Sequence, residues 1–521
     1  MDTASDNYAS DFMSIVHVDD ETVTNITFDR AVVRTLDRGS HRKTKMRSLF
    51  IRTTTPVFAA LLAALAPAPA RAQQPPLTPN QAQAHDIYKQ LIEINTADSV
   101  GSVTKAVDAM AARFRAAGFP AADVQILTPD GHPTKANLVV RYHGTGHDKK
   151  PLLLLAHLDV VAALRSDWSM DPFVLTEKDG YYYGRGTSDD KAMASIFVAN
   201  LLRDKAAGWK PDRDIILALT SDEESGDANG VEWLVANHKD LIDAAYAINE
   251  GGGGSIRNGK PFSNSVQAAE KVSVHFTVST ANSGGHSSVP RPDNAIYELA
   301  HALIKLEHFQ FPVELNEVSR AYLSETGASD TSAAGAAMRA IVANPGDSAA
   351  AAVLSAEPRY NSMLRTTCVA TRLSGGHAYN ALPQTATANV NCRIVPTQSP
   401  EDVEATLARV FADTGVRISP LFPLPTARAA PSPLTPELMN AVTKITHDMF
   451  GSNVIVVPVM STGATDGRFL RAAGIPTYGV SGILSNGDSH AHGRDERMWI
   501  KSYYDGQEFL YRLTHALAGG K

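Results

Sequence analysis

The stretch of sequence that decides the fold is Leu152-Leu-Leu-Leu-Ala-His157-Leu-Asp159. Its apolar run predicts a buried strand, and two polar residues follow where that strand ends. Residues two positions apart in an extended segment point the same way, so we expect His157 and Asp159 to face one side together. This pairing suits an imidazole that binds a metal ion while a carboxylate holds its other nitrogen.

Short apolar runs alternate with helical patterns on both sides of this stretch. The alternation predicts an α/β catalytic domain with a mostly parallel sheet and helices on both faces. Sites in such sheets form at the carboxyl ends of the strands, where we expect His157. The predicted strands are 137–142, 151–156, 215–220, 245–249, 454–459 and 475–480, and the predicted helical stretches are 78–118, 192–204, 230–238, 436–450 and a last one ending near residue 518.

The pattern changes at Val272, where Val272-Ser-Val-His-Phe-Thr-Val278 alternates like a half-exposed strand. A helix is predicted at 294–306, and two further strands surround Gly375-Gly376. We therefore expect a smaller α+β domain inserted into the first. Residues 311–359, rich in Ala and Ser, indicate a helical insertion of unassigned role. The predicted division is an N-terminal extension with signal peptide at 1–72, catalytic parts at 73–271 and 397–521, and the inserted domain at 272–396.

Length and charge narrow the classes of function. A chain of 521 residues is longer than one hydrophobic core usually serves, which favours two domains. The formal net charge of -7 and the isoelectric point near 6.2 give no sign of the clustered basic face that binds DNA or RNA. Nucleic acid is therefore not expected as a partner.

The first 72 residues have the pattern of a leader. Basic residues between Arg42 and Arg52 precede an apolar run at 56–66, and Ala70-Arg-Ala72 matches the small-x-small cleavage pattern of a secretory signal. Cleavage after Ala72 predicts an exported protein, periplasmic or secreted. The apolar run is shorter than the roughly 20 residues that span a membrane, so no stable membrane insertion is expected after cleavage. An uncleaved anchor is the alternative.

The chain has two cysteines, Cys368 and Cys392, on predicted strands that flank the Gly-Gly loop. In an exported protein they can be bonded to each other. Two buried free thiols are the alternative, and the sequence leaves both open. A zinc site is not expected there, because neither cysteine has a Cys or His partner at ligand spacing.

Asp189 lies in the turn Gly184-Arg-Gly-Thr-Ser-Asp-Asp190 before a predicted helix. The glycines permit a tight backbone there. A short carboxylate on such a backbone can bridge two cations by giving one oxygen to each. A Gly-Arg-Gly segment alone indicates no more than a turn, so this interpretation depends on the other motifs.

Acidic residues follow two more predicted strands. Glu223 and Glu224 come after strand 215–220 and cannot both point in the same direction. One is expected to bind metal while its neighbour takes a proton from a water that the metal has acidified. Glu250 ends another apolar strand before four glycines, where missing side chains leave room for a substrate. An Asp-Glu-Glu run alone is more often a solvated turn, but its position after a strand favours a site.

These motifs together resemble those of the two-zinc metallopeptidase family that includes glutamate carboxypeptidase, aminoacylase, carnosinase and succinyl-diaminopimelate desuccinylase. The resemblance covers about residues 81–518. It implies two Zn²⁺ ions, or another divalent metal such as Co²⁺ or Mn²⁺. The implied ligands are His157 and Glu250 for one ion, Glu224 and His492 for the other, and Asp189 as the bridge.

The resemblance also assigns roles around these ligands. It implies Glu223 as general base and a cis peptide bond between Asp189 and Asp190. Asp159, expected from its spacing to hold the imidazole of His157, completes the predicted catalytic set with Glu223 and His286. The segment Ser489-His-Ala-His492-Gly-Arg-Asp-Glu496 offers two histidines. The family pattern places the ligand four residues before a glutamate, which selects His492.

Residues of the smaller domain resemble the substrate-binding groups of the family. His286, in Gly284-Gly-His-Ser-Ser288, resembles the histidine that stabilises the oxyanion, and the alternative is a histidine in a polar loop. Asn380 and Arg393 resemble the residues that hold the substrate carbonyl and carboxylate, a task that suits the planar fork of arginine. A further substrate-lining turn is implied at Ser461-Thr-Gly463-Ala-Thr465-Asp466.

The expected reaction is hydrolysis of an amide bond next to a free carboxylate, in a peptide or an N-acyl amino acid, by a zinc-activated water. Glu250 weakly favours N-acyl amino acids, because several dipeptidases carry aspartate there. Aminopeptidase or dipeptidase action on unblocked peptides is the nearest alternative, and a catalytically silent binding protein of the same fold comes from another class. Family members often pair through the smaller lid or dimerisation domain, so a homodimer is one expectation.

Overall fold

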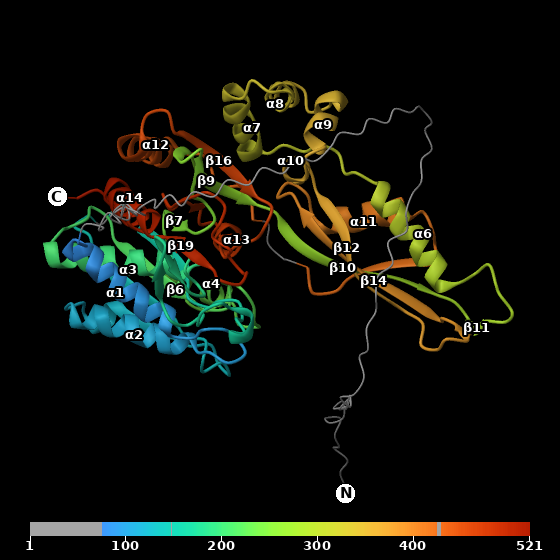
Figure 1. The fold of residues 1–521 in the computed structure, drawn as a ribbon, viewed down its shortest axis with the longest axis horizontal. Helices are drawn as coiled ribbons and strands as arrows, with labels where there is room; N and C mark the ends of the chain where they lie inside the picture. The colour runs from blue at the N-terminus through green and yellow to red at the C-terminus, as the bar shows by residue number, and fades with distance from the viewer. Residues whose placement is uncertain (1–75, 147, 425–428, 521) are drawn as a thin grey trace, which may run out of the picture. The chain divides into compact units, whose positions relative to one another are not determined.

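The computed structural model describes residues 76–146, 148–424 and 429–520. The predicted extension and signal peptide at 1–72 lie outside these residues. Within the described ranges, no helix has the length and apolar character that crossing a membrane requires. Two main sheets, each with its own hydrophobic core, organise the chain from residue 76 onward (Figure 1).

The larger sheet has ten strands in the order β1-β2-β6-β3-β7-β17-β9-β8-β18, with β16 paired to β9. Its central pairs, β6 with β3, β3 with β7 and β7 with β17, are parallel, whereas β1 with β2, β2 with β6 and β8 with β9 are antiparallel. The predicted mostly parallel sheet is confirmed. Its strands are Val124–Leu127 (β1), Asn137–Tyr142 (β2), Leu152–His157 (β3), Ile215–Thr220 (β6), Tyr246–Asn249 (β7), Gly254–Arg257 (β8), Lys260–Glu270 (β9), Ile455–Ser461 (β16), Thr477–Gly479 (β17) and Leu484–Ser485 (β18).

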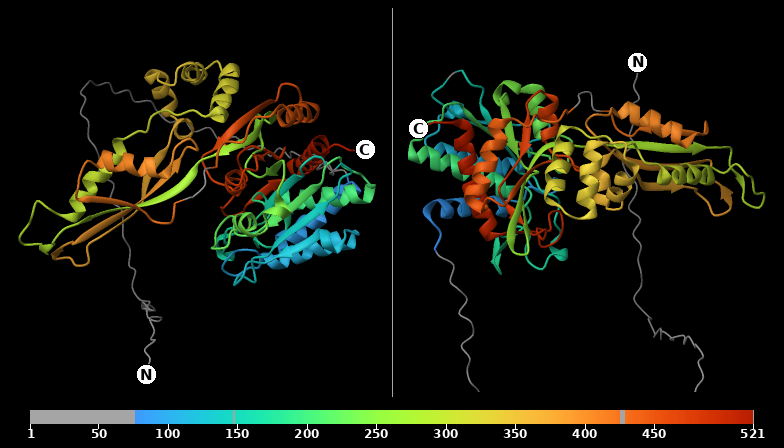
Figure 2. Two further views of the ribbon diagram at one scale, coloured as in Figure 1. Left: turned by 180° about the vertical axis from the view of Figure 1, so that it is seen from behind. Right: turned by 90° about the horizontal axis from the view of Figure 1, so that it is seen from above.

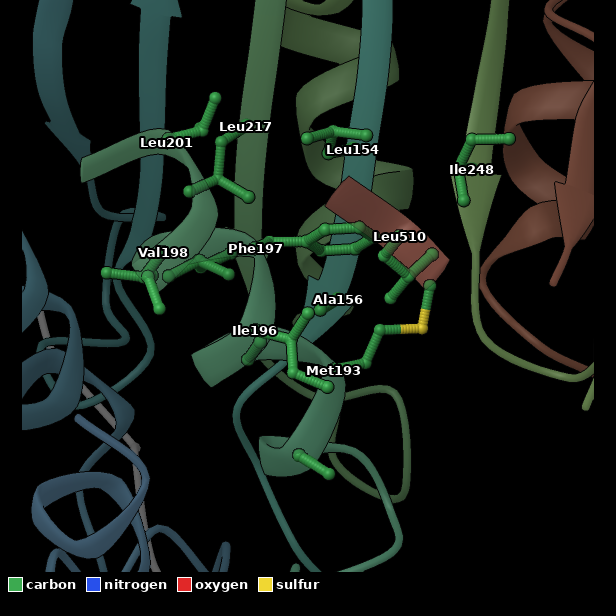
Figure 3. Close-up of a cluster of buried hydrophobic side chains, with 14 of the residues drawn as sticks. Leu154, Ala156, Met193, Ile196, Phe197, Val198, Leu201, Leu217, Ile248 and Leu510 are labelled. Carbon is green, nitrogen blue, oxygen red and sulfur yellow. The ribbon is translucent and has the colours of Figure 1, made fainter. Parts of the chain in front are cut away.

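Helices cover both faces of this sheet because its central strands are apolar on both sides. Along β3, Leu152, Leu154 and Ala156 belong to one hydrophobic core, and Leu153 and Leu155 belong to the core on the opposite face. Figure 3 shows part of the first core, which also receives side chains from α3 and α14. The helices on that face are Pro79–Glu93 (α1), Val103–Ala116 (α2), Lys191–Ala207 (α3), Pro436–Phe450 (α12) and Ile500–Ala518 (α14), and those on the other are Gly230–Asn237 (α4), Lys239–Ile242 (α5) and Gly467–Ala472 (α13).

The helical stretch predicted at 78–118 is two helices, α1 and α2. The chain turns between them, and Gly101 there approaches the backbone of Asn95 and Ala97 too closely for a side chain. Several short strands were not predicted at all. They include β1, the hairpin of β8 and β9, β18, and the small sheet of Thr176–Lys178 (β4), Tyr181–Tyr183 (β5) and Arg497–Trp499 (β19).

The smaller sheet is antiparallel, in the order β12-β14-β10-β15. Val274, Phe276 and Val278 alternate along β10 and face a core shared with two helices. The predicted boundary at residue 396 is too early, because β15 pairs with β10 and so belongs to this sheet. The elements are Val272–Ala281 (β10), Ala295–His308 (α6), Thr367–Gly375 (β12), Thr385–Ile394 (β14), Pro400–Phe411 (α11) and Val416–Pro420 (β15).

Two strands of this sheet carry the cysteines. Cys368 on β12 lies opposite Cys392 on β14, and the two form a disulfide. The sequence had left this bond and a pair of free thiols equally open. The structure decides for the disulfide, because antiparallel register sets the two residues directly across from each other.

The helical insertion is confirmed as four helices between the two parts of the smaller sheet. It has a core of its own, in which Tyr322 and Met363 pack with Val457 of β16. The insertion is therefore anchored on the larger sheet through the face of β16 (Figures 1 and 2). Its helices are Glu317–Ser329 (α7), Ala333–Ala343 (α8), Ser348–Ser355 (α9) and Pro358–Leu364 (α10).

Candidate metal centre

Asp189 lies between two histidines. Its Oδ1 is 3.0 Å from Nε2 of His157, the last residue of β3, and its Oδ2 is 3.1 Å from Nε2 of His492. The same His492 nitrogen lies 2.9 Å from Oε1 of Glu224. One carboxylate thus turns one oxygen toward each imidazole, which is the arrangement that a bridge between two cations needs.

Two groups of side chains place ligand atoms close enough to share an ion. The atoms of His157, Glu223 and Glu250 lie within 4.8 Å of one another, and so do those of His157, Asp189 and Glu224. Glu223 is as close to this cluster as the residues expected to be ligands. Its separate role as general base therefore stays a prediction.

The carboxylates of the cluster repel one another. Burial, and then the charges of neighbouring acids, raise the pKa of Glu223 to about 8. Burial and the charge of Asp189 raise the pKa of Glu224 to about 7, and burial holds the pKa of Glu250 well above its ordinary value. Bound cations relieve such repulsion and favour the charged carboxylates. Together with the imidazoles, this donor set fits divalent metal ions such as zinc.

The pKa values of the two histidines are also raised, but the cause is hydrogen bonding to acids rather than burial. Burial disfavours the charged ring of His157, but hydrogen bonds to Asp159 and Asp189 outweigh it and hold its pKa well above the ordinary value. The hydrogen bond to Asp189 raises the pKa of His492 to about 9. Between each histidine nitrogen and the Asp189 oxygen that faces it, a shared proton takes the place that a metal ion bound to both atoms would occupy.

Asp159 supports the centre in a way that the sequence did not predict. The closest partner of His157 Nδ1 is the backbone oxygen of Asp159 at 3.0 Å, whereas the Asp159 carboxylate lies 3.6 Å away. That carboxylate instead accepts hydrogen bonds from the backbone N–H groups of Glu223 at 3.1 Å and Glu224 at 2.9 Å. Asp159 therefore holds the main chain that carries both glutamates.

Glu496 is a second supporting residue whose role the sequence did not reveal. Its fully buried carboxylate accepts from the backbone N–H groups of Gly186, Ser188 and Asp189, at 3.1, 2.7 and 3.2 Å. Arg185 is paired with it at 2.7 Å. One sequence signal could have revealed this role, namely the position of Glu496 four residues after His492. In the sequence analysis that spacing served only to select His492 as the ligand. The peptide bond that follows Asp189 is cis, as the resemblance implied.

The four glycines after Glu250 line the centre, but they are required for a different reason than expected. A side chain at Gly252 would meet the backbone oxygen of Gly479 at 2.0 Å, and one at Gly251 would meet Gln267 at 2.5 Å. Close packing of the chain, rather than space for a substrate, therefore excludes side chains at these two positions. A cavity of about 380 Å³ is lined by these glycines together with Asp189 and Glu250.

The predicted substrate-lining turn is held from β9. Glu270 accepts from the backbone N–H and the hydroxyl of Thr465, at 3.0 and 2.8 Å, and pairs with Arg471 at 2.7 Å. Gly463 donates its N–H to the Ser461 hydroxyl at 3.1 Å and is exposed. This turn thus has a defined shape next to the end of β16.

The smaller domain gathers two of its predicted residues on one hairpin. His286 on Gly285–His286 (β11) lies opposite Ala381 on Ala381–Leu382 (β13), directly after Asn380. Arg393 is on β14 and is half-buried. In the part of the chain that the structure describes, no hydrogen bond or ion pair joins His286, Asn380 or Arg393 to the metal-ligand cluster. The second histidine of the late motif, His490, contacts the backbone oxygen of Arg494 instead of the cluster.

Comparison with known proteins agrees with this geometry. The model of peptidase family M20/M25/M40 matches residues 153–516. The N-fatty-acyl-amino acid synthase/hydrolase of Homo sapiens is 28% identical over 382 residues, which cover 71% of this chain and 74% of that protein. A probable carboxypeptidase S-like protein of Dictyostelium discoideum is 30% identical over 391 residues, 72% of this chain and 73% of that protein.

Solved structures share the fold. An M20 family metallo-carboxypeptidase from Sulfolobus solfataricus has a TM-score of 0.63 at 19% identity, over 84% of this chain and 99% of its own. Human carnosine dipeptidase 1 has a TM-score of 0.57 at 16% identity, over 84% of this chain and 96% of its own. The chain belongs to peptidase family M20/M25/M40 and is a metal-dependent hydrolase of amide bonds.

Proposed function

We propose that this protein hydrolyses amide bonds that lie next to a free carboxylate, in N-acyl amino acids and in peptides, with two Zn²⁺ ions at the metal centre. The observation that carries the proposal is Asp189, whose two oxygens each face a different histidine at 3.0 and 3.1 Å. A surface carboxylate pairs with cations from solvent or from lysine and arginine. Asp189 instead lies among imidazoles and further carboxylates, as metal ligands do.

The chain offers one shared ligand and two ligands for each ion. When bound, the two ions polarise the amide carbonyl and acidify the attacking water. Imidazole and carboxylate donors suit Zn²⁺, and Co²⁺ or Mn²⁺ can take the same donors. The proposed ligands are His157 and Glu250 for the first ion, Glu224 and His492 for the second, and Asp189 for both.

Glu223 is the proposed general base. Its backbone is fixed by Asp159, so its side chain is presented from a rigid segment next to His157 and Glu250. The Glu223 carboxylate takes a proton from water as the water oxygen bonds to the amide carbon. The C–N bond then breaks, and Glu223 gives that proton to the leaving nitrogen. The immediate products are a carboxylic acid and an amine. Transfer of the second water proton from the acid to the amine gives a carboxylate and an ammonium group, so atoms and charges balance.

Arg393 is the proposed anchor for the substrate carboxylate. Among the described residues it has no ion-pair partner, although burial and the charge of Arg468 lower its pKa. A half-buried guanidinium without an acid favours binding of a carboxylate from a ligand. Asn380 and His286 are proposed to hold the substrate carbonyl and the oxyanion of the tetrahedral intermediate.

The relatives favour a substrate of this class. One is named for N-fatty-acyl-amino acids, and the other is named as carboxypeptidase-like. Both names describe an amide whose leaving amine bears a carboxylate.

Export is also proposed, because the leader pattern at 42–72 is joined by a disulfide between Cys368 and Cys392. A homodimer through the smaller domain remains an expectation from the family.

A panel of substrates tests this proposal. N-acyl amino acids, the same compounds with an amidated carboxylate, and unblocked dipeptides are offered to the zinc-loaded protein with and without a chelator. We expect turnover of the free-carboxylate amides, loss of turnover on chelation, and its return when zinc is added. Faster turnover of unblocked peptides would favour the aminopeptidase alternative. Metal binding without turnover of any compound would favour a silent binding protein.

A further inference from the structure

Lys271 is the single residue between the two main sheets. It follows the end of β9 at Glu270 and precedes the start of β10 at Val272. Its side chain is fully buried, and its ammonium group donates to the hydroxyl of Thr367 at 3.3 Å. An ammonium group has three N–H donors, so this contact leaves most of its capacity unused. Keeping such a cation in the protein interior costs free energy unless an anion compensates it.

The charged groups that act on Lys271 are themselves cations. Burial, and then the charges of Arg393 on β14 and Arg365 before β12, lower the pKa of Lys271 to about 7. In the part of the chain that the structure describes, no carboxylate pairs with Lys271 or with Arg393. The adjacent acid, Glu270, is already paired with Arg471 at 2.7 Å. The cluster of Lys271, Arg393 and Arg365 therefore lacks an anion.

Strand register brings Lys271 and Arg393 to the same face of the smaller sheet. Thr367, which accepts from the Lys271 ammonium, is directly opposite Arg393 in the pair of β12 and β14. Ser273, two residues after Lys271, is opposite Arg393 in the pair of β14 and β10. Residues that lie opposite each other on neighbouring strands share a face of the sheet. The ammonium and the guanidinium therefore border one site.

Arg393 and Arg365 differ in what they already bind. Arg365 is buried and donates to Gln310 and Ser355 at 2.9 and 3.0 Å, so both of its terminal nitrogens have partners. Within the described ranges, the guanidinium of Arg393 donates no hydrogen bond to another residue. Arg393 and Lys271 thus keep donors for a ligand, while Arg365 contributes a fixed positive charge. A planar guanidinium beside an ammonium suits the two oxygens of a carboxylate.

The turn that was predicted to line the substrate connects this cluster with the metal centre. Its first residue, Ser461, accepts a hydrogen bond from the backbone N–H of Lys271 at 2.9 Å. Its last residue, Asp466, accepts from the hydroxyl of Thr220 at 3.4 Å. Thr220 in turn lies opposite the proposed metal ligand His157 in the pair of β6 and β3. The turn therefore runs from the metal centre to the cation cluster.

We propose that Lys271 and Arg393 together bind the carboxylate of the substrate, with Arg365 as a fixed charge behind them. This inference rests on the proposed function, which places the amide at the metal ions and gives the carboxylate to Arg393 alone. It adds Lys271 as a residue that determines specificity. The bound carboxylate supplies the anion that the buried ammonium lacks, so the site distinguishes a carboxylate from its neutral amide more sharply than one arginine would.

Replacing Lys271 by Met tests the inference, because Met keeps the length of the side chain and removes the ammonium group. In the zinc-loaded, full-length protein, kcat/KM is measured for one N-acyl amino acid and for its amidated form. We expect a fall of roughly 10- to 100-fold for the free carboxylate, as for a lost charge-assisted hydrogen bond, and little change for the amide.

The matched control is Lys305→Met on α6 of the same domain. There the ammonium group binds the backbone oxygen of Phe411, away from the cation cluster. This variant should leave kcat/KM unchanged for both substrates. If Lys271→Met fails to fold, Lys271→Gln, which retains a partner for Thr367, is measured in its place.

Thermal unfolding separates a binding role from a structural one. Without ligand, Lys271→Met should unfold at a higher temperature than the unmodified protein, because it removes an uncompensated buried charge. The free amino acid that the reaction releases should raise the unfolding temperature of the unmodified protein more than that of the variant. A lower unfolding temperature, with equal losses on both substrates, would make Lys271 a structural residue and contradict the proposal.

The pH dependence gives a further readout that a structural role would not change. The ammonium form binds the carboxylate, and with a pKa of about 7 that form predominates below pH 7 and is lost above it. Arg393 and Arg365 stay charged throughout this range. The ratio of kcat/KM for the free carboxylate to that for the amide should therefore fall as pH rises through 7, and should stay level in Lys271→Met.

Added chloride distinguishes the substrate carboxylate from a permanently bound inorganic anion. We expect chloride to compete with the free-carboxylate substrate and raise its KM, while hydrolysis of the amidated substrate is unaffected. If chloride instead raised kcat/KM for both substrates, the cluster would hold an inorganic anion during catalysis and the proposal would be wrong.

The outcomes also separate this inference from the proposed function. If Lys271→Met lowers kcat/KM equally for both substrates, or changes neither, the carboxylate role of Lys271 is contradicted while amide hydrolysis stands. If the unmodified, zinc-loaded protein hydrolyses no N-acyl amino acid and no peptide, the proposed function itself fails.

Discussion

Glu223 and Glu224 are adjacent in sequence and are held by the same acid, yet they are proposed to do different work. Asp159 accepts one backbone hydrogen bond from each, so both residues start from a fixed main chain. Glu224 contacts His492, whereas the ligand atoms near Glu223 belong to His157 and Glu250. Both side chains come close to His157, and they differ in their other neighbours, which are Glu250 for Glu223 and Asp189 with His492 for Glu224.

Replacing Glu223 by Gln removes the proton acceptor but keeps the size of the side chain. We expect a folded protein that still binds two metal ions, with kcat lower by roughly 10² to 10⁴. Metal content by mass spectrometry and turnover of an N-acyl amino acid are measured together. Glu232→Gln, an exposed acid on α4, serves as the control and should leave both unchanged. Nearly normal turnover in Glu223→Gln would assign the proton transfer to another group.

Arg393→Lys keeps the positive charge but loses the two-pronged geometry. If Arg393 binds the substrate carboxylate, kcat/KM for free-carboxylate substrates should fall by an amount worth roughly 1.5 to 3 kcal/mol. Substrates with an amidated carboxylate already lack that contact and should change little. An equal loss on both kinds would show instead that Arg393 supports the smaller sheet beside the disulfide residue Cys392.

The kinds of residue in the centre could be predicted from sequence, because the end of an apolar strand can be located and acids or histidines there stand out. His157, Glu223 and Glu250 each follow such a run. The contacts of Glu496 could not be predicted, since they join residues 307 to 310 positions apart. The hydrogen bonds from the backbone of Glu223 and Glu224 to Asp159 could not be predicted either, because they depend on how the loop after β3 meets the loop after β6.

At the scale of elements, the loop between β5 and α3 owes its shape to the C-terminal region. Glu496 gathers three backbone N–H groups of that loop and the guanidinium of Arg185. Its own carboxylate is fully buried, so its charge depends on these donors, and Arg185 ties the loop further to the backbone oxygens of His492 and Gly493. The loop then presents Asp189 to both histidines.

Glu496→Gln removes the charge that compensates Arg185. We expect the free energy of unfolding to fall by roughly 3 to 5 kcal/mol, as for a broken buried ion pair. Metal affinity should also fall, by roughly 10- to 100-fold, because the backbone that carries Asp189 loses its support. Denaturant unfolding and zinc competition measure the two effects.

The control for that experiment is Glu508→Gln on α14, which breaks a partly exposed pair with Arg512. Its effect on unfolding should stay within about 1 kcal/mol, and zinc affinity should not change. If the two variants had the same small effects, Glu496 would not be the support of the loop.

Element boundaries were predictable where the ends carry strong local signals. Helix α12 runs from Pro436 to Phe450 as predicted, because Thr435 caps it and Gly451 follows it. Strand β15 was missed as part of the smaller sheet, because its partner β10 lies far back in the chain. The hairpin of β8 and β9 was missed because polar residues such as Ser263 and Ser265 interrupt its apolar pattern.

At the scale of the whole molecule, the chain places the proposed chemistry on the larger sheet and the proposed selection of substrate on its additions. The proposed ligands His157, Glu224 and Glu250 lie at the ends of β3, β6 and β7 in the parallel centre, where such sheets form their sites. The proposed carboxylate anchor, Arg393, comes from the smaller sheet. Substrate preference can therefore change without altering the metal centre.

The number of metal ions per chain tests the central claim most directly. The protein is stripped with chelator and titrated with Zn²⁺, while bound metal and hydrolysis of an N-acyl amino acid are followed in the same samples. We predict two ions per chain, return of activity as the sites fill, and loss of metal from both sites in Asp189→Ala, since that residue is proposed as a ligand of both ions. Full activity without bound metal, or two tightly bound ions in Asp189→Ala, would contradict the account.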